Sequence, residues 1–333
     1  WPKAFGGRDA TPIESVIWNQ EVSRYVTPDG LFIIGQGMCA PTLMAYGNDA
    51  HKAEHLPKIA SGEEVWCQLF SEPVAGSDLA GIKTRAVRDG DKWIINGQKV
   101  WTSRALHSDL MLLLARTTPA DKVEKRVDGL SVFLIDLREA VGSGCEIKPL
   151  DAMINHNTTE VFFDNCRIPA DSLIGEEGRG FRYILDGMNA ERILIAGESI
   201  GDARYFTKKA VDYSNERVVF GRSIGSNQGI QFPIAAAYAE LEAADLMTRK
   251  AAALFDSGVD CGAEANIAKH LAAEVAWKMG EACMQTFGGF AYAREYDIER
   301  KWREARLYRT APISTNLILS YIGQHVLGMP RSF

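Results

Sequence analysis

A glutamate within an apolar helical pattern is the first residue of this sequence whose type and position suggest chemistry. In GMNAERILIAG, residues 187–197, spacings of three and four residues place Met188, Glu191 and Ile195 on one face of a predicted helix. A carboxylate on an apolar stripe is costly unless it is paired with a cation or its pKa is raised. A raised pKa suits a general base that works near neutral pH, whereas a salt bridge inside a helical bundle would be purely structural.

Two stretches in the first third of the chain combine small, aromatic and hydroxyl side chains. In LFSEPVAGSDLAG, residues 69–81, small residues leave backbone N–H groups accessible to a phosphate or a flat ligand, although a plain surface turn has the same composition. In KVWTSRA, residues 99–105, strand alternation would place Trp101 and Ser103 on one face, where an aromatic wall and a hydroxyl suit a ring ligand. The structural alternative is a core tryptophan beside exposed hydroxyls.

Two later stretches combine glycines with charged or amide side chains. NERVVFGRSIGSNQGIQF, residues 215–232, has arginines that could hold a pyrophosphate and amides that could bind a ligand edge, or it is an ordinary interhelical loop. In QTFGGFAYAREYDIERKWRE, residues 285–304, a Gly-Gly pair interrupts a helix, so backbone could meet a ligand or another subunit. A loop followed by a salt-bridged surface helix would account for the same letters.

The elements that must position these residues change character twice along the chain. Residues 12–60 follow a helical pattern, with an expected break near 35–41. Short apolar runs over 66–170 predict a small antiparallel barrel or sandwich, with hairpin turns at Asp89-Gly90 and Asn96-Gly97. Long helical segments then favour an antiparallel four-helix bundle, and they cover residues 180–216, 230–257, 263–288 and 313–328.

The predicted fold class is therefore α+β, with three domains in chain order. We expect an N-terminal helical domain over 1–65, a middle antiparallel β-barrel-like domain over 66–175 and a C-terminal four-helix bundle over 176–333. The sequence begins at Trp1 in what reads as the middle of a domain, so we expect the N-terminal domain to be truncated and any targeting segment to be invisible.

The composition narrows the classes of partner and compartment. The 333 residues are 46% hydrophobic and 24% charged, with a formal net charge of −6 and no long basic cluster, which disfavours nucleic acid and anionic membranes as partners. No apolar run is long enough to insert across a membrane. Six scattered cysteines without a CxxC pair favour free thiols in a reducing compartment over disulfides or a metal site. We expect a cytoplasmic protein, or a mitochondrial matrix protein if the source is eukaryotic.

Taken together, these stretches resemble the signature sequences of the acyl-CoA dehydrogenase family, in the same order and over essentially the whole chain. SEPVAGSDLAG resembles the first signature, T/S-E-x-x-A/G-G-S-D-x-x-G, and QTFGGFAYAREYDIERKWRE the second, with Ala291 where glycine is usual. KVWTS is similar to K-x-W-I-T, NERVVFGRSIGSNQ to E-R-x-x-F-G-x-x-I-x-x-x-Q, and IGEEGRGFRYIL to the loop that opens the bundle. Each match is weak alone, and five in register identify the chain as a member of the family.

The resemblance implies an FAD-dependent enzyme of fatty acid metabolism that forms a homotetramer, a dimer of dimers. Such an enzyme converts an acyl-CoA to a trans-2-enoyl-CoA: a carboxylate takes the α-proton and the β-hydrogen leaves as hydride to flavin N5. Hydrogen bonds from the flavin ribityl hydroxyl and a backbone N–H would stabilise the enolate-like charge on the thioester oxygen. Reduced FAD would pass its electrons to an electron-transferring flavoprotein.

The resemblance also implies roles for individual residues. FAD would lie between the middle domain and the bundle, with Ser71 at its pyrimidine end, Trp101 against the isoalloxazine and Ser103 toward N5. Asn189 and Arg192 would contact the CoA moiety. The other expected FAD contacts, several of them to the cofactor of a neighbouring subunit, are Gln68, Phe70, Ser77, Thr102, Arg217, Phe220, Asn227, Gln228, Gln285, Gly288, Gly289, Ser314 and Asn316. Expected substrate contacts also include Ser77 and Ile313.

The chain departs from the family pattern at the position of the usual catalytic base. Many members have this glutamate in Y-E-G-T-x-Q near the C-terminus, but here the aligned stretch is RLYRTAPISTNLIL, with Pro312 at the Glu position and Ile313 at the Gly position. Proline cannot accept a proton. The isovaleryl and long-chain branches of the family place their base on a bundle helix immediately before an Arg, and that position is Glu191, before Arg192.

Three functions remain open from the sequence. The first is an acyl-CoA dehydrogenase with Glu191 as base, acting on a branched or long acyl chain more readily than on a short straight one, with steroid side-chain and aryl thioesters also open. The second is an acyl-CoA oxidase, in which O₂ accepts the electrons. The third is a non-catalytic subunit of a heteromeric dehydrogenase, which the loss of the usual Glu would fit and the retained FAD motifs would not.

Overall fold

The computed structural model describes residues 1–22, 25 and 27–331, and the chain in it divides into two compact units. The first unit comprises Trp1–Asp9 and Pro28–Met188, and the second comprises Ala10–Thr27 and Asn189–Phe333. Each unit has its own buried apolar core, and each is described by itself below.

Short helices precede the sheet in the first unit. A π turn at Gly35–Cys39 leads directly into α2 (Ala40–Tyr46), and α3 follows at Asp49–Ser61. The predicted break near 35–41 is wrong, because the backbone stays helical from the π turn into α2, and Pro41 is accommodated in the first turn of α2. α3 begins where the Asn48 side chain accepts from the N–H of His51, and it ends before its C-cap residue, Gly62.

The strands of the first unit form one mixed sheet of eight strands among the described residues. They are β1 (Trp66–Leu69), β2 (Arg85–Asp89), β3 (Lys92–Ser103), β4 (Leu110–Arg116), β5 (Leu130–Asp136), β6 (Cys145–Pro149), β7 (Thr158–Pro169) and β8 (Leu173–Ile174). Their order is β6-β7-β3-β2-β4-β5-β8, with β1 also beside β4. The middle domain is β-rich as predicted, but not purely antiparallel, because β1 runs parallel to β4.

Strand β4 has apolar side chains on both faces of the sheet. Met111 and Leu113 belong to the core on one face, whereas Leu112 and Leu114 belong to the core shared with α2 and α3. Alternation along a strand sends successive side chains to opposite faces, so this run of continuous apolar residues is buried on both sides.

Only one of the two predicted hairpin turns closes a hairpin. Asp89 and Lys92 pair across the turn between β2 and β3, as predicted. Asn96-Gly97 instead lies inside β3, where the register against β7 shifts in a bulge. Glycine is required at 97 for close approach, since a Cβ there would lie 2.4 Å from the Oγ1 of Thr84.

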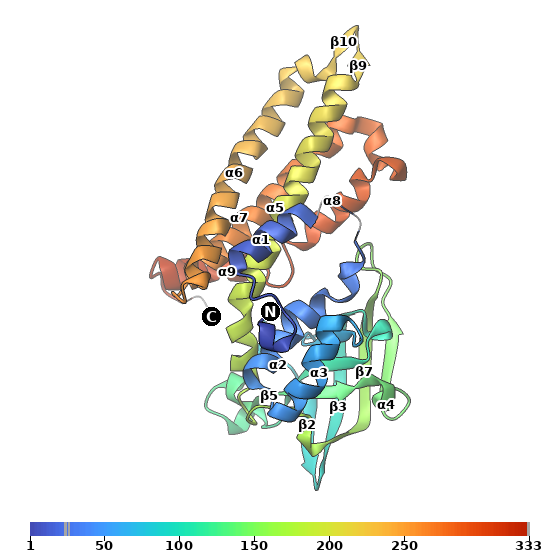
Figure 1. Ribbon diagram of the computed structural model, residues 1–333, viewed down its shortest axis with the longest axis vertical. Helices are drawn as coiled ribbons and strands as arrows, with labels where there is room; N and C mark the ends of the chain where they lie inside the picture. The colour runs from blue at the N-terminus through green and yellow to red at the C-terminus, as the bar shows by residue number, and fades with distance from the viewer. Residues whose placement is uncertain (23–24, 26, 332–333) are drawn as a thin grey trace. The chain divides into compact units, whose positions relative to one another are not determined.

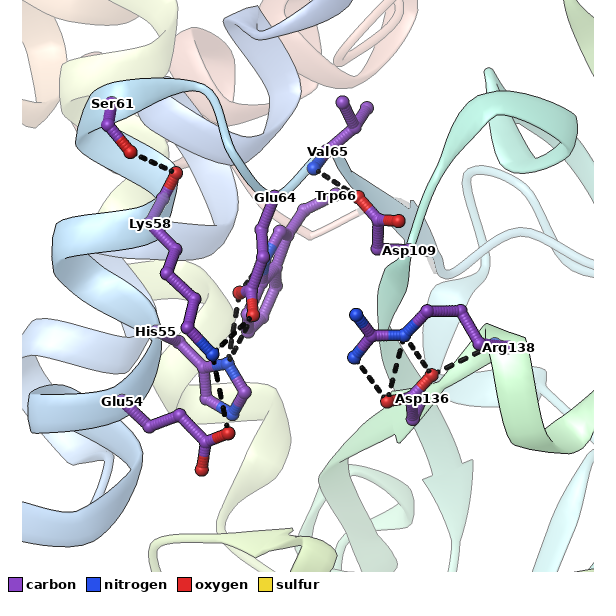
Figure 2. Close-up of polar contacts among 10 residues, drawn as sticks. All are labelled: Glu54, His55, Lys58, Ser61, Glu64, Val65, Trp66, Asp109, Asp136 and Arg138. Atoms are coloured by element: carbon purple, nitrogen blue, oxygen red, sulfur yellow. Dashed lines mark hydrogen bonds and ion pairs between the residues drawn. The ribbon is translucent and has the colours of Figure 1, made fainter.

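A buried glutamate connects α3 to the start of the sheet (Figure 2). The Glu64 carboxylate lies 3.0 Å from Nδ1 of His55 and 3.3 Å from Nζ of Lys58, and it accepts a hydrogen bond from the indole of Trp66 at 3.1 Å. Burial acts to raise the pKa of Glu64, but the hydrogen bonds from His55 and Trp66 outweigh burial, so its pKa lies below the ordinary value. The carboxylate is therefore ionised and fully engaged at neutral pH.

The second unit is helical. Its elements are α1 (Pro12–Val22), the part of α5 (Gly180–Glu216) from Asn189 on, α6 (Gln228–Asp256), α7 (Gly262–Phe287), α8 (Ile298–Leu307) and α9 (Thr315–Tyr321), the last continued by a π turn at Ile322–Val326. α6 and α7 run side by side, and many small Ala side chains let helices in this core pack closely (Figure 1). Three of the four long helical segments predicted from periodicity are confirmed within two residues at each end, whereas the fourth, predicted over 313–328, is a short helix followed by the π turn.

None of the described helices is both long enough and apolar enough to cross a lipid bilayer.

Candidate active site

Glu191 lies on α5 within the second unit, next to apolar neighbours. Ile193 is fully buried, whereas Glu191 itself is half-buried. Burial raises the pKa of Glu191 to about 7, against the opposing positive charges of Arg192 and Lys269. The predicted raised pKa is thus confirmed. The structure shows no salt bridge or hydrogen bond to this carboxylate among the described residues, which argues against a purely structural role.

Arg192 follows Glu191 on α5, and only part of its guanidinium group is hydrogen-bonded to the described residues. Its Nη1 donates to Oδ1 of Asn189 at 2.8 Å, while its buried Nε has no hydrogen-bond partner among the residues that the structure describes. The two residues expected to contact CoA are therefore hydrogen-bonded to each other. A buried guanidinium nitrogen without an acceptor is uncommon and is a position where an anionic or carbonyl ligand oxygen would be stabilised.

The loop between α8 and α9 contains Pro312 and Ile313, and α7 holds it in place. Nζ of the fully buried Lys269 donates to the backbone carbonyl oxygens of Tyr308 and, at 2.8 Å, Ile313. Ser314 begins α9 as its N-cap, where its hydroxyl accepts from the N–H of Leu317. Proline at 312 offers no ionisable group, and Glu191 on α5 has a pKa suited to a base without a hydrogen bond of the kind that joins Glu198 to Tyr308 among the described residues.

A cavity of about 530 Å³ lies at one end of the helices of the second unit. Arg217 lines it, together with Gly288 and Gly289, so three of the expected FAD contacts share one cavity. A Cβ at either glycine would meet nothing within 4 Å, which leaves open space beside the backbone. Arg217 also lies over the ring of Phe290, 5.7 Å from its centroid. An arginine beside exposed glycine backbone suits a diphosphate.

The hairpin formed by β9 (Val218–Val219) and β10 (Arg222–Ser223) presents a fully exposed aromatic side chain. Phe220 has 101% relative exposure and a φ of 56°. Arg222 donates to the side chain of Asn227 at 2.8 Å, and Gln228 starts α6 with an exposed side chain. The expected contacts to a neighbouring subunit's cofactor thus include surface groups of this unit.

In the first unit, the end of β3 brings three of the expected flavin contacts together. Trp101 is 62% exposed with a φ of 61°, at a register shift between β3 and β7. The regular alternation expected for Trp101 and Ser103 therefore fails, because the bulge adds a residue to β3. The Oγ1 of Thr102 is buried without a partner, and Ser103 accepts from Asn155 at 2.6 Å.

A buried ion pair fastens loop 70–84, which carries Ser71 and Ser77, to β3. Nζ of Lys99 lies 2.9 Å from Oε1 of Glu72 and donates to the Phe70 carbonyl oxygen, also at 2.9 Å. A backbone hydrogen bond adds to this attachment: the Val100 N–H donates to the carbonyl oxygen of Ser71 at 3.0 Å. Two segments that are distant in sequence are thus held in one arrangement.

Both partners of this pair are almost completely buried, with side chains 0% and 4% exposed. Glu72 also accepts from the N–H groups of Lys83 and Thr84, at 2.6 and 2.9 Å. Burial lowers the pKa of Lys99 to about 8, although the charge of Glu72 acts in the opposite direction. Sequence reasoning did not single out Glu72 or Lys99, yet a Glu and a Lys inside two ligand-binding motifs are a usable signal for such a pair.

The remaining expected contacts lie in both units. Gln68 and Phe70 lie at the end of β1, while Gln285 is exposed near the end of α7 and Asn316 is exposed on α9. Ser77 is exposed in the loop after β1. Sequence reasoning also missed a buried polar cluster on α5 and α8, formed by Glu198, Asp202, Lys301 and Tyr308.

The residues present fit a flavin nucleotide. The first unit offers an exposed tryptophan next to a buried, unpartnered hydroxyl, and the second offers an arginine beside glycine backbone in a cavity. An aromatic face and hydroxyl groups suit a ring system, and the arginine and backbone N–H groups suit a diphosphate.

Comparisons with known proteins agree with this chemistry. The N-terminal, middle and C-terminal domains of acyl-CoA dehydrogenase match residues 1–63, 67–166 and 178–327. The acyl-CoA dehydrogenase FadE12 of Mycobacterium tuberculosis is 35% identical over 334 residues, which cover 100% of this chain and 85% of that protein.

Two solved structures have the same fold. The acyl-CoA dehydrogenase from Geobacillus kaustophilus matches with a TM-score of 0.92 and 28% identity, over 98% of this chain and 85% of that one. The FAD complex of PigA matches with a TM-score of 0.89 and 26% identity, over 98% of this chain and 85% of that one. This chain belongs to the acyl-CoA dehydrogenase family of oxidoreductases, which act on CH–CH bonds.

Proposed function

We propose that this protein oxidises an acyl-CoA to its trans-2-enoyl-CoA with Glu191 as the catalytic base. The single observation that carries the proposal is a half-buried carboxylate on α5 with a pKa raised to about 7, in a family member whose usual base position holds Pro312. A base with this pKa is substantially ionised at neutral pH and still basic enough to accept a proton from carbon.

The chain's own residues perform the proton half of the reaction. The α-proton passes to a carboxylate oxygen of Glu191, and the β-hydrogen leaves with its electron pair, so that the Cα–Cβ bond becomes double. FAD, when bound, supplies the acceptor for that hydride. Arg192, with its unpartnered Nε, and Asn189 hold the CoA part of the substrate, and Ile313 contacts the acyl chain.

Residues of both units would bind the FAD, each to the part of the cofactor that its side chain suits. Trp101 would lie against the flavin ring, and the hydroxyls of Ser71, Thr102 and Ser103 would be its hydrogen-bonding partners. Arg217, with the cavity glycines, binds the diphosphate of a cofactor in a neighbouring subunit of a homotetramer. The electron acceptor is an electron-transferring flavoprotein, and the substrate has a branched or long acyl chain.

The test compares two glutamates of the same helix. Glu191→Gln is expected to purify yellow with FAD but to lose flavin bleaching by an acyl-CoA panel, by at least about 100-fold in rate. Glu198→Gln is the matched control, because Glu198 is also a half-buried carboxylate on α5 with a pKa raised to about 7 by burial. Near wild-type bleaching by Glu191→Gln would refute the assignment of the base, and hydrogen peroxide release at turnover rates would make O₂ the acceptor instead.

A further inference from the structure

A lysine that the reaction does not consume lies close to the candidate base. Lys269 is on α7, and its side chain is fully buried. Its ammonium group donates to the carbonyl oxygens of Tyr308 and Ile313, which are the two ends of the segment that contains Pro312. An ammonium group has three N–H donors, and the described residues supply acceptors for two of them.

We propose that Lys269 is a positioning residue for catalysis: it clamps the loop 308–313 through two carbonyl oxygens, and the positive charge held there favours the ionised form of Glu191. The proposal rests on the proposed function, because it takes Glu191 as the base. Lys269 does not touch the reacting atoms in this account. It acts through the loop and through the charge of its neighbour.

The clamp is part of a wider set of contacts that fix the loop. Glu274, five residues after Lys269 on α7, accepts from Nε of Arg309 at 2.8 Å. The carbonyl oxygen of Arg309 in turn accepts from the N–H of Thr315 at 3.1 Å. Two residues of α7 therefore hold both the start and the end of the loop, so the position of Ile313 is determined by α7 and not by the loop alone.

A buried polar cluster anchors the first residue of the loop. The hydroxyl of Tyr308 lies 3.1 Å from Oε1 of Glu198 and 3.0 Å from Oδ2 of Asp202. Lys301 on α8 pairs with the other oxygen of Asp202 at 2.5 Å. The side chain of Tyr308 is fixed by this cluster, while its carbonyl oxygen is fixed by Lys269. Both the side chain and the backbone of Tyr308, the first residue of the loop, are therefore held by hydrogen bonds.

The positive charge of Lys269 also acts on the Glu191 carboxylate directly, without the loop. The charged groups that act on Glu191 are Arg192 on the same helix and Lys269 on α7, and both favour the ionised carboxylate. Lys269 itself is acted on by Arg192, Glu274 and Glu191, and burial lowers its pKa to about 8. Lys269 therefore carries a charge at neutral pH, and removing it leaves Arg192 as the single cation that opposes the effect of burial on Glu191.

The experiment measures the pH dependence of flavin bleaching by acyl-CoA in the FAD-loaded enzyme under anaerobic conditions. Lys269→Met is expected to move the midpoint of the acidic limb, where activity rises as Glu191 ionises, upward by about one pH unit, because the ionised carboxylate loses a cation. Lys269→Arg, which keeps the charge, is expected to leave the midpoint near that of the wild type. Lys301→Met is the matched control, since it removes a buried ammonium group that does not act on Glu191.

A purely structural clamp would give a different result. Lys269→Met and Lys301→Met would then both lower thermal stability and leave the midpoint unchanged, and that result would overturn the proposal. If Lys269→Met fails to fold, Lys269→Gln keeps a donor for the carbonyl oxygens and is read in the same way. Loss of bleaching in Glu191→Gln together with an unmoved midpoint in Lys269→Met would refute this inference alone, whereas retained bleaching in Glu191→Gln would refute the proposed function.

Discussion

Replacing Lys99 by methionine is expected to destabilise the first unit by about 3–5 kcal/mol, because it leaves the buried Glu72 carboxylate without its cation. The magnitude follows from burial: the two side chains are 0% and 4% exposed, so water cannot take the place of the lost ammonium group. In a unit of this size, such a loss corresponds to a fall of roughly 6–20 °C in the unfolding temperature.

The structure also predicts the effect of replacing Glu72, the other partner of the ion pair, in the Lys99→Met variant. Glu72→Gln in the Lys99→Met background removes the stranded charge and keeps an oxygen that can accept from the N–H of Thr84, now at 2.9 Å from Glu72. The double variant is therefore expected to be more stable than Lys99→Met alone, which gives a coupling free energy of about 1–3 kcal/mol in a double-mutant cycle.

Calorimetric unfolding and the ratio of bound FAD to protein are the two measurements. Because the pair fastens loop 70–84 to the end of β3, the FAD content of Lys99→Met is expected to fall together with its stability. Arg167→Met is the matched control, since the Arg167–Asp89 pair lies in the same sheet with both side chains more than half exposed, and exposed pairs contribute at most about 1 kcal/mol. Equal destabilisation by the two substitutions would refute the reasoning.

Two further predictions concern titration. The pKa of Glu64 is lowered in the folded protein, so the ionised carboxylate stabilises the fold above the ordinary pKa of 4.5, and this stabilisation is lost as pH falls through the folded-state pKa. The difference in unfolding free energy between wild type and Glu64→Gln, about 2–3 kcal/mol at pH 7, should therefore shrink in acid. A constant difference between pH 7 and pH 3 in urea titrations would contradict this prediction. The pKa of Glu191 is raised from 4.5 to about 7, so ionisation destabilises the fold as pH rises, and Glu191→Gln should gain up to about 3 kcal/mol over wild type at pH 8 relative to pH 4, as measured by the same titrations. A gain that does not depend on pH would mean that Glu191 titrates normally.

Periodicity predicted the long helices well because each buries a continuous apolar stripe. The limits of α5, α6 and α7 follow this stripe closely. The sequence-based prediction failed where one residue pair is compatible with two backbone structures. Asn96-Gly97 is typical of a hairpin turn, but here the glycine lets Thr84 approach β3, and it lies at a bulge whose partner strand, β7, is distant in sequence.

The candidate site was predicted in a similar, partial way. Glu191 was identifiable because a carboxylate among apolar residues violates the local pattern, and its raised pKa confirms that reasoning. Lys269 violates the pattern of α7 in the same way, but its role depends on carbonyl oxygens of a loop about 40 residues away, which no local pattern encodes. Glu72 and Lys99 likewise acquire their meaning only when the loop and the strand meet.

The most direct measurement of the central claim isolates the proton step from the hydride step. A 3-thia-acyl-CoA has sulfur in place of the β-carbon and so has no β-hydrogen to transfer, while its α-hydrogens can still exchange with D₂O. With FAD-loaded protein, NMR is expected to show enzyme-dependent loss of the α-hydrogen signal for wild type and for Glu198→Gln, and a rate at least about 100-fold lower for Glu191→Gln. Undiminished exchange in Glu191→Gln would contradict the assignment of this residue as the base.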